Sequence, residues 1–418
     1  MLTDLGRFMR CALWCGAIAL SPLGYANAAQ SEEQGIGQIE PAEEQDNDDV
    51  VTVDHAVPHY STVPANEGEL VHLFVRERDS SHRRNRAAVL MIHSRSIPVA
   101  AAYELQPDSD YDWAFRLAKS GGFDVFMLDF QGSGRSPRPK MDDPCNVPTV
   151  QQISTLIPNP LGGTCSPSYP FVLNTTGSDL DELDTVVDYI RNLRGVDKVH
   201  LVSWSQGSFR IGPYAALHPE KVASLFFLAP IFNTAFQPTD APSGLPRPGT
   251  PMTLRTRAGH ESGWDIEVKC EGQREAGIQD AVWAAIMEND ELGRTWGPPP
   301  AGAPAGSPPE GVIRVREVTL WGWNATVASG LRVPTLIMQG EFDTGQGGRQ
   351  DLAALYSLVD NPNKLRFRVQ CTGHFMEWEN QRRLLHRVSK EWLKHGKVAG
   401  FTQGEFFIDT AGDLFPLF

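Results

Sequence analysis

The sequence predicts an α/β fold, in which a doubly wound, mostly parallel sheet is covered by helices on both faces and carries an inserted cap subdomain. Three observations predict it. Short apolar runs alternate with amphipathic helical patterns, polar residues follow several of these runs, and one long segment breaks the alternation. Apolar runs of this kind are typical of parallel strands, which are buried on both faces.

The alternation extends from about residue 69 to residue 395. In chain order the expected elements are strand 69–76, strand 87–92, helix 111–119, strand 123–128, helix 178–194, strand 199–202, a helix that ends at 217, strand 222–228, strand 334–338, strand 365–369 and helix 377–395. The helix 178–194 has Ser178 as its expected N-cap and Gly195 as its stop signal. Before it lies an irregular excursion, 137–177.

The segment that breaks the alternation, 232–331, is too long to be a loop within a compact domain. Its residues 297–311 are almost entirely Pro, Gly, Ala and Ser, whereas 278–292 has a helical pattern. We therefore expect a cap at the carboxyl edge of the sheet. The expected division is a signal peptide 1–28, an acidic disordered leader 29–50, a first core part 51–231, the cap 232–331, a second core part 332–396 and a C-terminal tail 397–418.

The N-terminus has the pattern of an export signal. Arg7 and Arg10 precede an apolar stretch, and Ala26-Asn27-Ala28 matches a cleavage site between small residues. The apolar stretch of about 13 residues is shorter than the ~20 residues that span a bilayer, so a membrane anchor is the weaker interpretation. We expect a secreted or periplasmic protein with no integral membrane segment after signal cleavage.

Charge and cysteine content limit the classes of partner and compartment. A formal net charge of -14 at pH 7 argues against nucleic acid and anionic membrane surfaces as partners. Two of the six cysteines lie in the signal, and the other four would remain in an oxidising compartment. We favour Cys145–Cys165 with Cys270–Cys371, because the first pair lies within one Pro/Gly-rich excursion. The other two connectivities and free thiols stay open.

The most informative stretch is Ser203-Trp204-Ser205-Gln206-Gly207, which directly follows an apolar run. A strand that passes through small-x-Ser-x-Gly into a helix makes a sharp turn and exposes the central hydroxyl. The flanking small residues avoid a collision with the neighbouring backbone. A serine hydroxyl is a poor nucleophile until a histidine accepts its proton and a carboxylate holds that histidine. Ser205 is therefore a candidate nucleophile that needs two partners.

Both partners follow later strands. Asp343 comes after the strand 334–338, and His374 comes after the strand 365–369. In doubly wound sheets, functional residues gather at the carboxyl ends of the strands, so these two side chains are expected near Ser205. Glu341 is the alternative acid, but it lies closer to the end of its strand.

The chain order Ser205, Asp343, His374 resembles that of α/β-hydrolase-fold enzymes, and the resemblance extends from about residue 70 to residue 395. It implies a serine hydrolase of the esterase or lipase kind, and the signal sequence makes it an exported, bacterial-type one. By this resemblance Ser205 is the nucleophile, His374 the general base and then acid, and Asp343 the carboxylate that orients His374.

The resemblance also implies an oxyanion hole made of backbone N–H groups. Gln206, directly after the nucleophile, supplies one of them. The second comes from the turn after the strand 87–92, where Arg95 is the better candidate and Ser94 the alternative. The chain departs from the family pattern at Ser94 and at Ser203, where the family usually has glycine.

The implied reaction is hydrolysis of a small-molecule carboxylic ester or lactone through an acyl-enzyme intermediate. It needs no cofactor and no metal, and the sequence has no cysteine and histidine cluster with zinc spacing and no phosphate-binding loop with a lysine. An amidase or peptidase and an acyltransferase, both with the same triad, remain alternatives. A non-catalytic binding protein on the same fold is a further one.

Three tryptophans are candidate substrate-binding residues. Trp204 flanks the nucleophile and either packs beneath the site or contacts the substrate, with packing favoured. Trp321 and Trp323 either line a substrate pocket or fill a small core within the cap. The substrate itself and the oligomeric state have no signature in the sequence.

Overall fold

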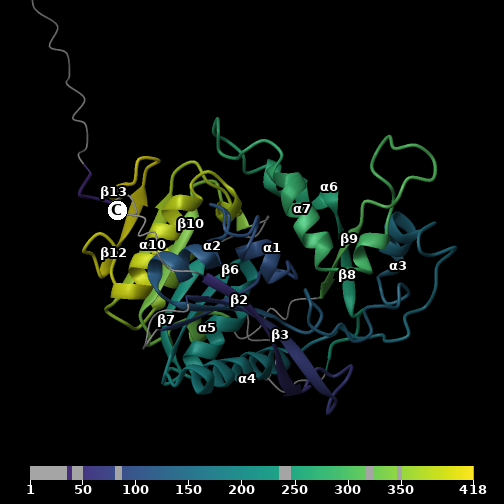
Figure 1. Cartoon of the computed structure of the whole chain (residues 1–418), viewed down its shortest axis with the longest axis horizontal. Helices are drawn as coiled ribbons and strands as arrows, with labels where there is room; N and C mark the ends of the chain where they lie inside the picture. The colour runs from purple at the N-terminus through teal and green to yellow at the C-terminus, as the bar shows by residue number, and fades with distance from the viewer. Residues whose placement is uncertain are drawn as a thin grey trace, which may run out of the picture. The chain divides into compact units, whose positions relative to one another are not determined.

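The computed structural model describes residues 35–39, 50–80, 87–234, 246–316, 323–345 and 351–417, which form an α/β fold around a mostly parallel sheet (Figure 1). The predicted fold class is therefore confirmed. The expected signal peptide, most of the expected leader, and Trp321 lie outside the described residues. Within the described ranges, no helix combines the length and the apolar character needed to cross a membrane.

The main sheet contains eleven strands within the described part of the chain. From one edge to the other they are β1 (Gly37–Gln38), β13 (Asp413–Pro416), β12 (Gln403–Ile408), β11 (Lys364–Val369), β10 (Thr335–Gly340), β7 (Val222–Leu228), β6 (Val199–Trp204), β4 (Ala88–Ile92), β5 (Asp124–Asp129), β3 (Leu70–Ser80) and β2 (Val50–Tyr60). The seven strands from β12 to β5 pair in parallel, and antiparallel strands flank them at both ends. The carboxyl ends of the parallel strands consequently share one edge of the sheet.

Helices cover both faces of the sheet. Successive side chains of a central strand point to opposite faces, and those on both faces are buried. In β6, Leu201 belongs to one core and Val202 to the other. The first face is covered by α1 (Val99–Tyr103), α2 (Trp113–Arg116) with its π-helical continuation η1 (Leu117–Gly121), and α10 (Arg382–His395). The second face is covered by α4 (Thr176–Arg194), α5 (Ser208–Leu217), α8 (Ala325–Ala328) and α9 (Leu352–Leu358).

The longest of these helices, α4, begins earlier than predicted, because its N-cap lies three residues before the expected cap, Ser178. Its N-cap is Thr175, whose side chain accepts a hydrogen bond from the backbone N–H of Ser178 at 3.1 Å. The hydroxyl oxygen of Ser178 in turn accepts a hydrogen bond from the backbone N–H of Thr175, so the two residues form a capping box. Gly195 ends the helix in the left-handed conformation, as expected.

The inserted segment and the excursion 137–177 share a small core of their own. The insertion contains the antiparallel pair β8 (Met252–Thr256) and β9 (Val312–Arg316), with α6 (Arg257–Asp265), α7 (Ile278–Glu288) and the turn η4 (Gly293–Thr295) between them; the excursion contains α3 (Thr149–Gln151) and η2 (Gln152–Leu156). Leu156 and Leu173 of the excursion pack with Met252 and Val312 of the insertion. Figure 1 shows α3 next to β8 and β9.

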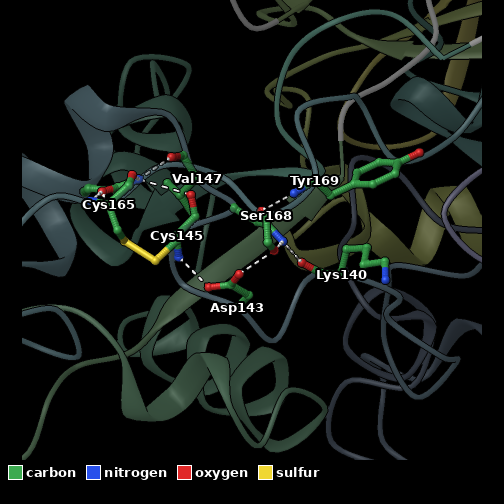
Figure 2. The surroundings of a disulfide bond; sticks show 9 residues. Lys140, Asp143, Cys145, Val147, Cys165, Ser168 and Tyr169 are labelled. Carbon is green, nitrogen blue, oxygen red and sulfur yellow. Dashed lines mark hydrogen bonds between the residues drawn. A yellow bond between two sulfur atoms is a disulfide. The ribbon is translucent and has the colours of Figure 1, made fainter.

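A disulfide between Cys145 and Cys165 closes the excursion, and it is one of the two pairs favoured by the sequence. Figure 2 shows the polar contacts around it. Asp143 accepts hydrogen bonds from the N–H of Cys145 at 2.9 Å and from the hydroxyl of Ser168 at 2.6 Å. Because the two cysteines are 20 residues apart, the bridge limits the freedom of a segment that contains little regular structure.

The segment 397–418 is not a tail apart from the core, as the sequence suggested. Its strand β12 pairs in parallel with β11, and β13 returns antiparallel to β12 and pairs with β1 from the expected leader. Phe406 and Ile408 are buried against the first face of the sheet. Alternating apolar residues thus extend the sheet beyond the last expected strand.

The predicted end of the cap at residue 331 is also wrong, because residues 323–331 belong to the core. Trp323 is fully buried on the second face, its Nε1 donates to the carbonyl of Ile231 at 3.0 Å, and its ring packs against Phe227 and Phe232. A Cβ on Gly212 of α5 would overlap this indole ring. Trp323 therefore fills a space that the glycine leaves open.

We predict that Trp323→Ala lowers the free energy of unfolding by about 3–5 kcal/mol, because it leaves a cavity under α5. Denaturant titration measures this loss. The matched control is Val150→Ala, at a side chain that is 71% exposed, where the change should stay within about 0.5 kcal/mol. An equally small effect at Trp323 would contradict its place in the core.

Candidate active site

Three chemically reactive side chains lie at the carboxyl edge of the sheet. Ser205 directly follows β6, Asp343 follows β10, and His374 follows β11. The three strands are parallel members of one sheet, with β7 between β6 and β10. The topology thus gathers groups that are up to 169 residues apart in the chain.

Ser205 lies at a strained turn. Its φ is 54°, in the left-handed region that a residue with a side chain rarely adopts. The chain leaves β6, forms one 3-10 turn, η3 (Ser205–Gly207), and continues as α5. The hydroxyl of Ser208 donates to the carbonyl of Ser205 at 2.8 Å and so closes the turn.

Close contacts require small residues two positions before and two positions after Ser205, at Ser203 and Gly207. A Cβ on Gly207 would lie 2.9 Å from the Cβ of Ser203 and 2.9 Å from the carbonyl oxygen of Ile92 at the end of β4. Such distances are shorter than van der Waals contact. Glycine at 207 and a small side chain at 203 are therefore conditions for this turn, and serine at 203 meets the condition where the family usually has glycine.

The three side chains form a hydrogen-bonded chain. His374 Nε2 lies 2.8 Å from Ser205 Oγ, and His374 Nδ1 lies 2.9 Å from Asp343 Oδ1. Ser205 is 6% exposed and His374 1% exposed. The alternative acid, Glu341, is turned away, because its Oε2 accepts from the N–H of Cys371 at 3.1 Å. The arrangement can move a proton from a serine hydroxyl to an imidazole that a carboxylate orients.

Electrostatic effects favour protonation of His374. Burial by itself lowers the pKa of its imidazole, but the charge and hydrogen bond of Asp343 and the charge of Glu267 outweigh burial, so the net pKa is raised above its ordinary value. Arg255 acts in the opposite direction. The imidazole is consequently a stronger base than a free one, while Asp343 steadies the cation that forms.

The expected oxyanion segments lie next to each other. Gln206 belongs to η3, and the closeness of Gly207 to Ile92 and His93 brings this turn against the end of β4. Beyond β4, Ser94 is buried and Arg95 is exposed. The choice between their two amides stays a prediction.

Two buried arginines support the turn after β4, and the sequence carried no signal for either of them. Arg210 of α5 donates to the carbonyl of His93 at 3.4 Å, and the backbone N–H of Arg316 donates to Ser96 Oγ at 3.1 Å. Asp179 of α4 accepts from both guanidinium groups, at 3.1 Å and 2.5 Å. The two buried guanidinium groups therefore share one carboxylate, which offsets part of the cost of burying their charges.

Both Trp204 and Trp323 are buried, so neither has the substrate-binding role considered for it, and Trp204 packs as the sequence favoured. Trp204 is 1% exposed, donates its Nε1 to the carbonyl of His374 at 2.9 Å, and packs edge-on against Phe375 and Trp378. Its indole thus supports the loop of His374 from the core side. Trp323 lies in the core on the second face of the sheet, as described above.

The second predicted disulfide, Cys270–Cys371, joins the inserted segment to the strand end that precedes His374. The same region contains two buried carboxylates that sequence patterns did not single out, Glu267 and Glu379. The backbone N–H of His374 donates to Glu267, and that of Gly373 donates to Glu379. No motif marks either glutamate, because their partners are brought together only by the fold.

Arg255 of β8 is a further charged residue near the site. Burial, followed by the charge of Arg95, lowers the pKa of its guanidinium to about 10. Its charge also reaches His374 and His260. The insertion thus contributes a positive charge to the surroundings of the imidazole.

One group of three carboxylates in the described residues has metal-like spacing, namely Glu77, Asp79 and Asp124. Arg194 lies among them, with its Nε 2.8 Å from Asp124 and its Nη2 paired with Glu77. Asp124 begins β5, so the group lies at the amino end of the parallel strands, whereas Ser205 lies at their carboxyl ends. Arg194 thus places a positive charge among the three carboxylates, in the role that a metal ion would otherwise have.

The family model described as alpha/beta hydrolase fold matches residues 105–381. No curated protein matches the chain. Similar solved structures include the carboxylesterase CesB from Bacillus subtilis, with 13% identity and a TM-score of 0.46 over 84% of this chain and 93% of that chain. A thermophilic esterase from Thermogutta terrifontis has 15% identity and a TM-score of 0.45 over 83% of this chain and 99% of that chain.

A third similar structure, described as a membrane phospholipase A and a bacterial virulence factor, has 16% identity and a TM-score of 0.44 over 82% of this chain and 87% of that chain. The family match covers more than half of the chain and includes Ser205, Asp343 and His374. The chain therefore belongs to the alpha/beta hydrolase fold family.

Proposed function

We propose that the chain is a serine hydrolase that cleaves a carboxylic ester or lactone through an acyl-enzyme intermediate. The observation that carries the proposal is the hydrogen-bonded chain from Ser205 Oγ through His374 to Asp343, with distances of 2.8 Å and 2.9 Å. This geometry lies within the range required for proton transfer. The left-handed turn at Ser205 is a second supporting feature.

In the first half of the reaction Ser205 Oγ attacks the ester carbonyl while His374 Nε2 takes its proton. The carbonyl oxygen becomes an oxyanion, which the backbone N–H groups of Gln206 and of Arg95, or of Ser94 in its place, stabilise; one such donor contributes about 3–4 kcal/mol. The tetrahedral intermediate then collapses, the alkoxide leaves, and His374 returns the proton to it. A lactone reacts in the same way, with the alcohol still attached to the acyl group.

In the second half a water molecule replaces the alcohol. His374 takes a proton from this water as its oxygen attacks the acyl carbon of the ester on Ser205. Collapse of the second intermediate breaks the bond to Ser205 Oγ, and His374 gives the proton back to the serine. Asp343 remains ionised and stabilises the imidazolium in both halves.

We also propose that the mature protein works outside the cytoplasm. The support is the signal-like N-terminus together with two disulfides, Cys145–Cys165 and Cys270–Cys371. Disulfides persist mainly in oxidising compartments.

We predict that Ser205→Ala lowers the hydrolysis of a short p-nitrophenyl ester by at least about 10⁴-fold, because the nucleophile is lost while the fold is kept. A fluorophosphonate should label the wild-type protein and not the variant. Ser154→Ala, at an exposed serine of the excursion, is the matched control and should keep both activity and labelling. Retained turnover in Ser205→Ala would exclude the proposed nucleophile.

Assays of the wild-type protein with other substrates distinguish the alternative reactions of this triad. Faster turnover of an aminoacyl-anilide than of the corresponding ester would indicate an amidase or peptidase. New acyl esters formed when an alcohol is supplied would indicate an acyltransferase. Neither labelling nor turnover in the wild type would indicate a binding protein on the same fold.

The pH dependence of kcat/KM should follow the proton of His374. The imidazole must be neutral to accept the serine proton, and its pKa is raised by Asp343 and Glu267 against the effect of burial. The activity should therefore rise with pH and reach half of its maximum above about pH 6.5, the ordinary value for histidine. In Asp343→Asn the rise should move to lower pH, and kcat should fall because the imidazole loses its orientation. A rise centred near pH 4 in the wild type would instead indicate a carboxylate base.

A further inference from the structure

We propose that Glu267 of the inserted segment is a positioning residue, which holds the Asp343 loop (residues 341–345) and the His374 loop (residues 370–375) at the distance that proton transfer requires. The proposal rests on the proposed function of the triad. It adds that the core sheet does not set this geometry alone, because a carboxylate from the insertion lies between the two loops.

Both oxygens of Glu267 are used by the two loops. Oε2 accepts from the backbone N–H of His374 at 2.6 Å. Oε1 accepts from the backbone N–H of Thr344 at 2.9 Å and from its hydroxyl at 2.7 Å. Thr344 is the neighbour of Asp343, so one side chain connects the residues that carry the acid and the base. All three partners are donors, which matches a carboxylate that only accepts.

The space for Glu267 depends on a glycine next to His374. Glu267 is fully buried, and a Cβ on Gly373 would lie 2.8 Å from its Oε2 and 2.9 Å from its Cβ. Any side chain at 373 would push the carboxylate away from the loop. The glycine thus allows the close approach on which the contact depends.

The segment that carries Glu267 is held on the His374 loop by other contacts as well. Trp264 and Gln273 both donate to Glu379 Oε1, at 2.9 Å and 3.1 Å, and the disulfide Cys270–Cys371 joins the same two stretches. These contacts do not involve the Glu267 carboxylate. A substitution at Glu267 should therefore leave the segment in place and change only the connection between the loops.

Several charges face His374 besides that of Glu267. Asp343 and Glu267 raise the pKa of the imidazole, and Arg255 lowers it. Burial raises the pKa of the neighbouring Glu379 to about 7 and that of Glu377 well above its ordinary value. Loss of the negative charge at 267 removes one of the three effects that raise the pKa of His374, so this pKa should fall.

The test is Glu267→Gln, with Glu271→Gln as the matched control. Glu271 is exposed, lies four residues along the same segment, and loses the same charge on substitution. The amide of glutamine can accept through one atom only, so at least one loop loses its acceptor. We expect kcat for ester hydrolysis to fall by about 10–100-fold, KM to change little, and the rise of kcat/KM to move to lower pH. Glu271→Gln should show none of these changes.

A histidine titration by NMR on the same proteins measures the pKa of His374 without any substrate. The titration also separates the two proposals. A wild-type protein that is inactive and that the fluorophosphonate does not label would contradict the proposed function. The effect of Glu267 on the pKa of His374 could still be measured in that case. Equal kcat, pH profile and His374 titration in Glu267→Gln and Glu271→Gln would overturn the positioning role.

Thr344 keeps the proposal testable if Glu267→Gln does not fold. Thr344 is exposed, so Thr344→Val should fold, and it loses the hydroxyl that makes one of the three bonds to Glu267. We expect kcat to fall several-fold in Thr344→Val and to be largely rescued in Thr344→Ser, which keeps the hydroxyl. Equal kcat in the two variants would contradict the proposal.

Discussion

Ser205 has a φ of 54°, a conformation that costs a residue with a side chain about 1–3 kcal/mol, and the surrounding structure has to hold it there. The parallel pairing of β6 with β4 and β7 holds the chain before the turn, and α5 holds it afterwards. The close approach of Gly207 to Ile92 follows from the same turn. That contact in turn places the end of β4 against the turn of Ser205, where the two expected oxyanion segments meet.

A second constraint is the burial of charge around His374. Charges interact more strongly where water is excluded, so the distances of Asp343, Glu267 and Arg255 from the imidazole matter more than they would at the surface. Two of these three residues come from the inserted segment, and only Asp343 comes from the core. The insertion therefore affects the pKa of His374 as well as covering part of the core, and Cys270–Cys371 ties it to the loop of that histidine.

The sequence predicted most of the sheet and the three groups now proposed as a triad, because each lies directly after a short apolar run and so depends on local patterns. It did not predict β12 and β13, because each of these strands has few buried residues and therefore a weak apolar pattern. Glu267 was missed for a different reason, because its partners lie 77 and 107 residues away. Trp323 was assigned to the cap because its complement, Gly212, is recognisable only in the fold.

The most direct measurement is the site of acylation during turnover. Rapid quenching of the wild-type protein with a slowly hydrolysed ester, followed by proteolysis and tandem mass spectrometry, locates the acyl group. A Ser205 nucleophile predicts the acyl mass on the peptide that contains Ser205, and on that residue. Acyl transfer to a different side chain, or turnover in which no acylated protein forms even when hydrolysis of the intermediate is slow, would contradict it.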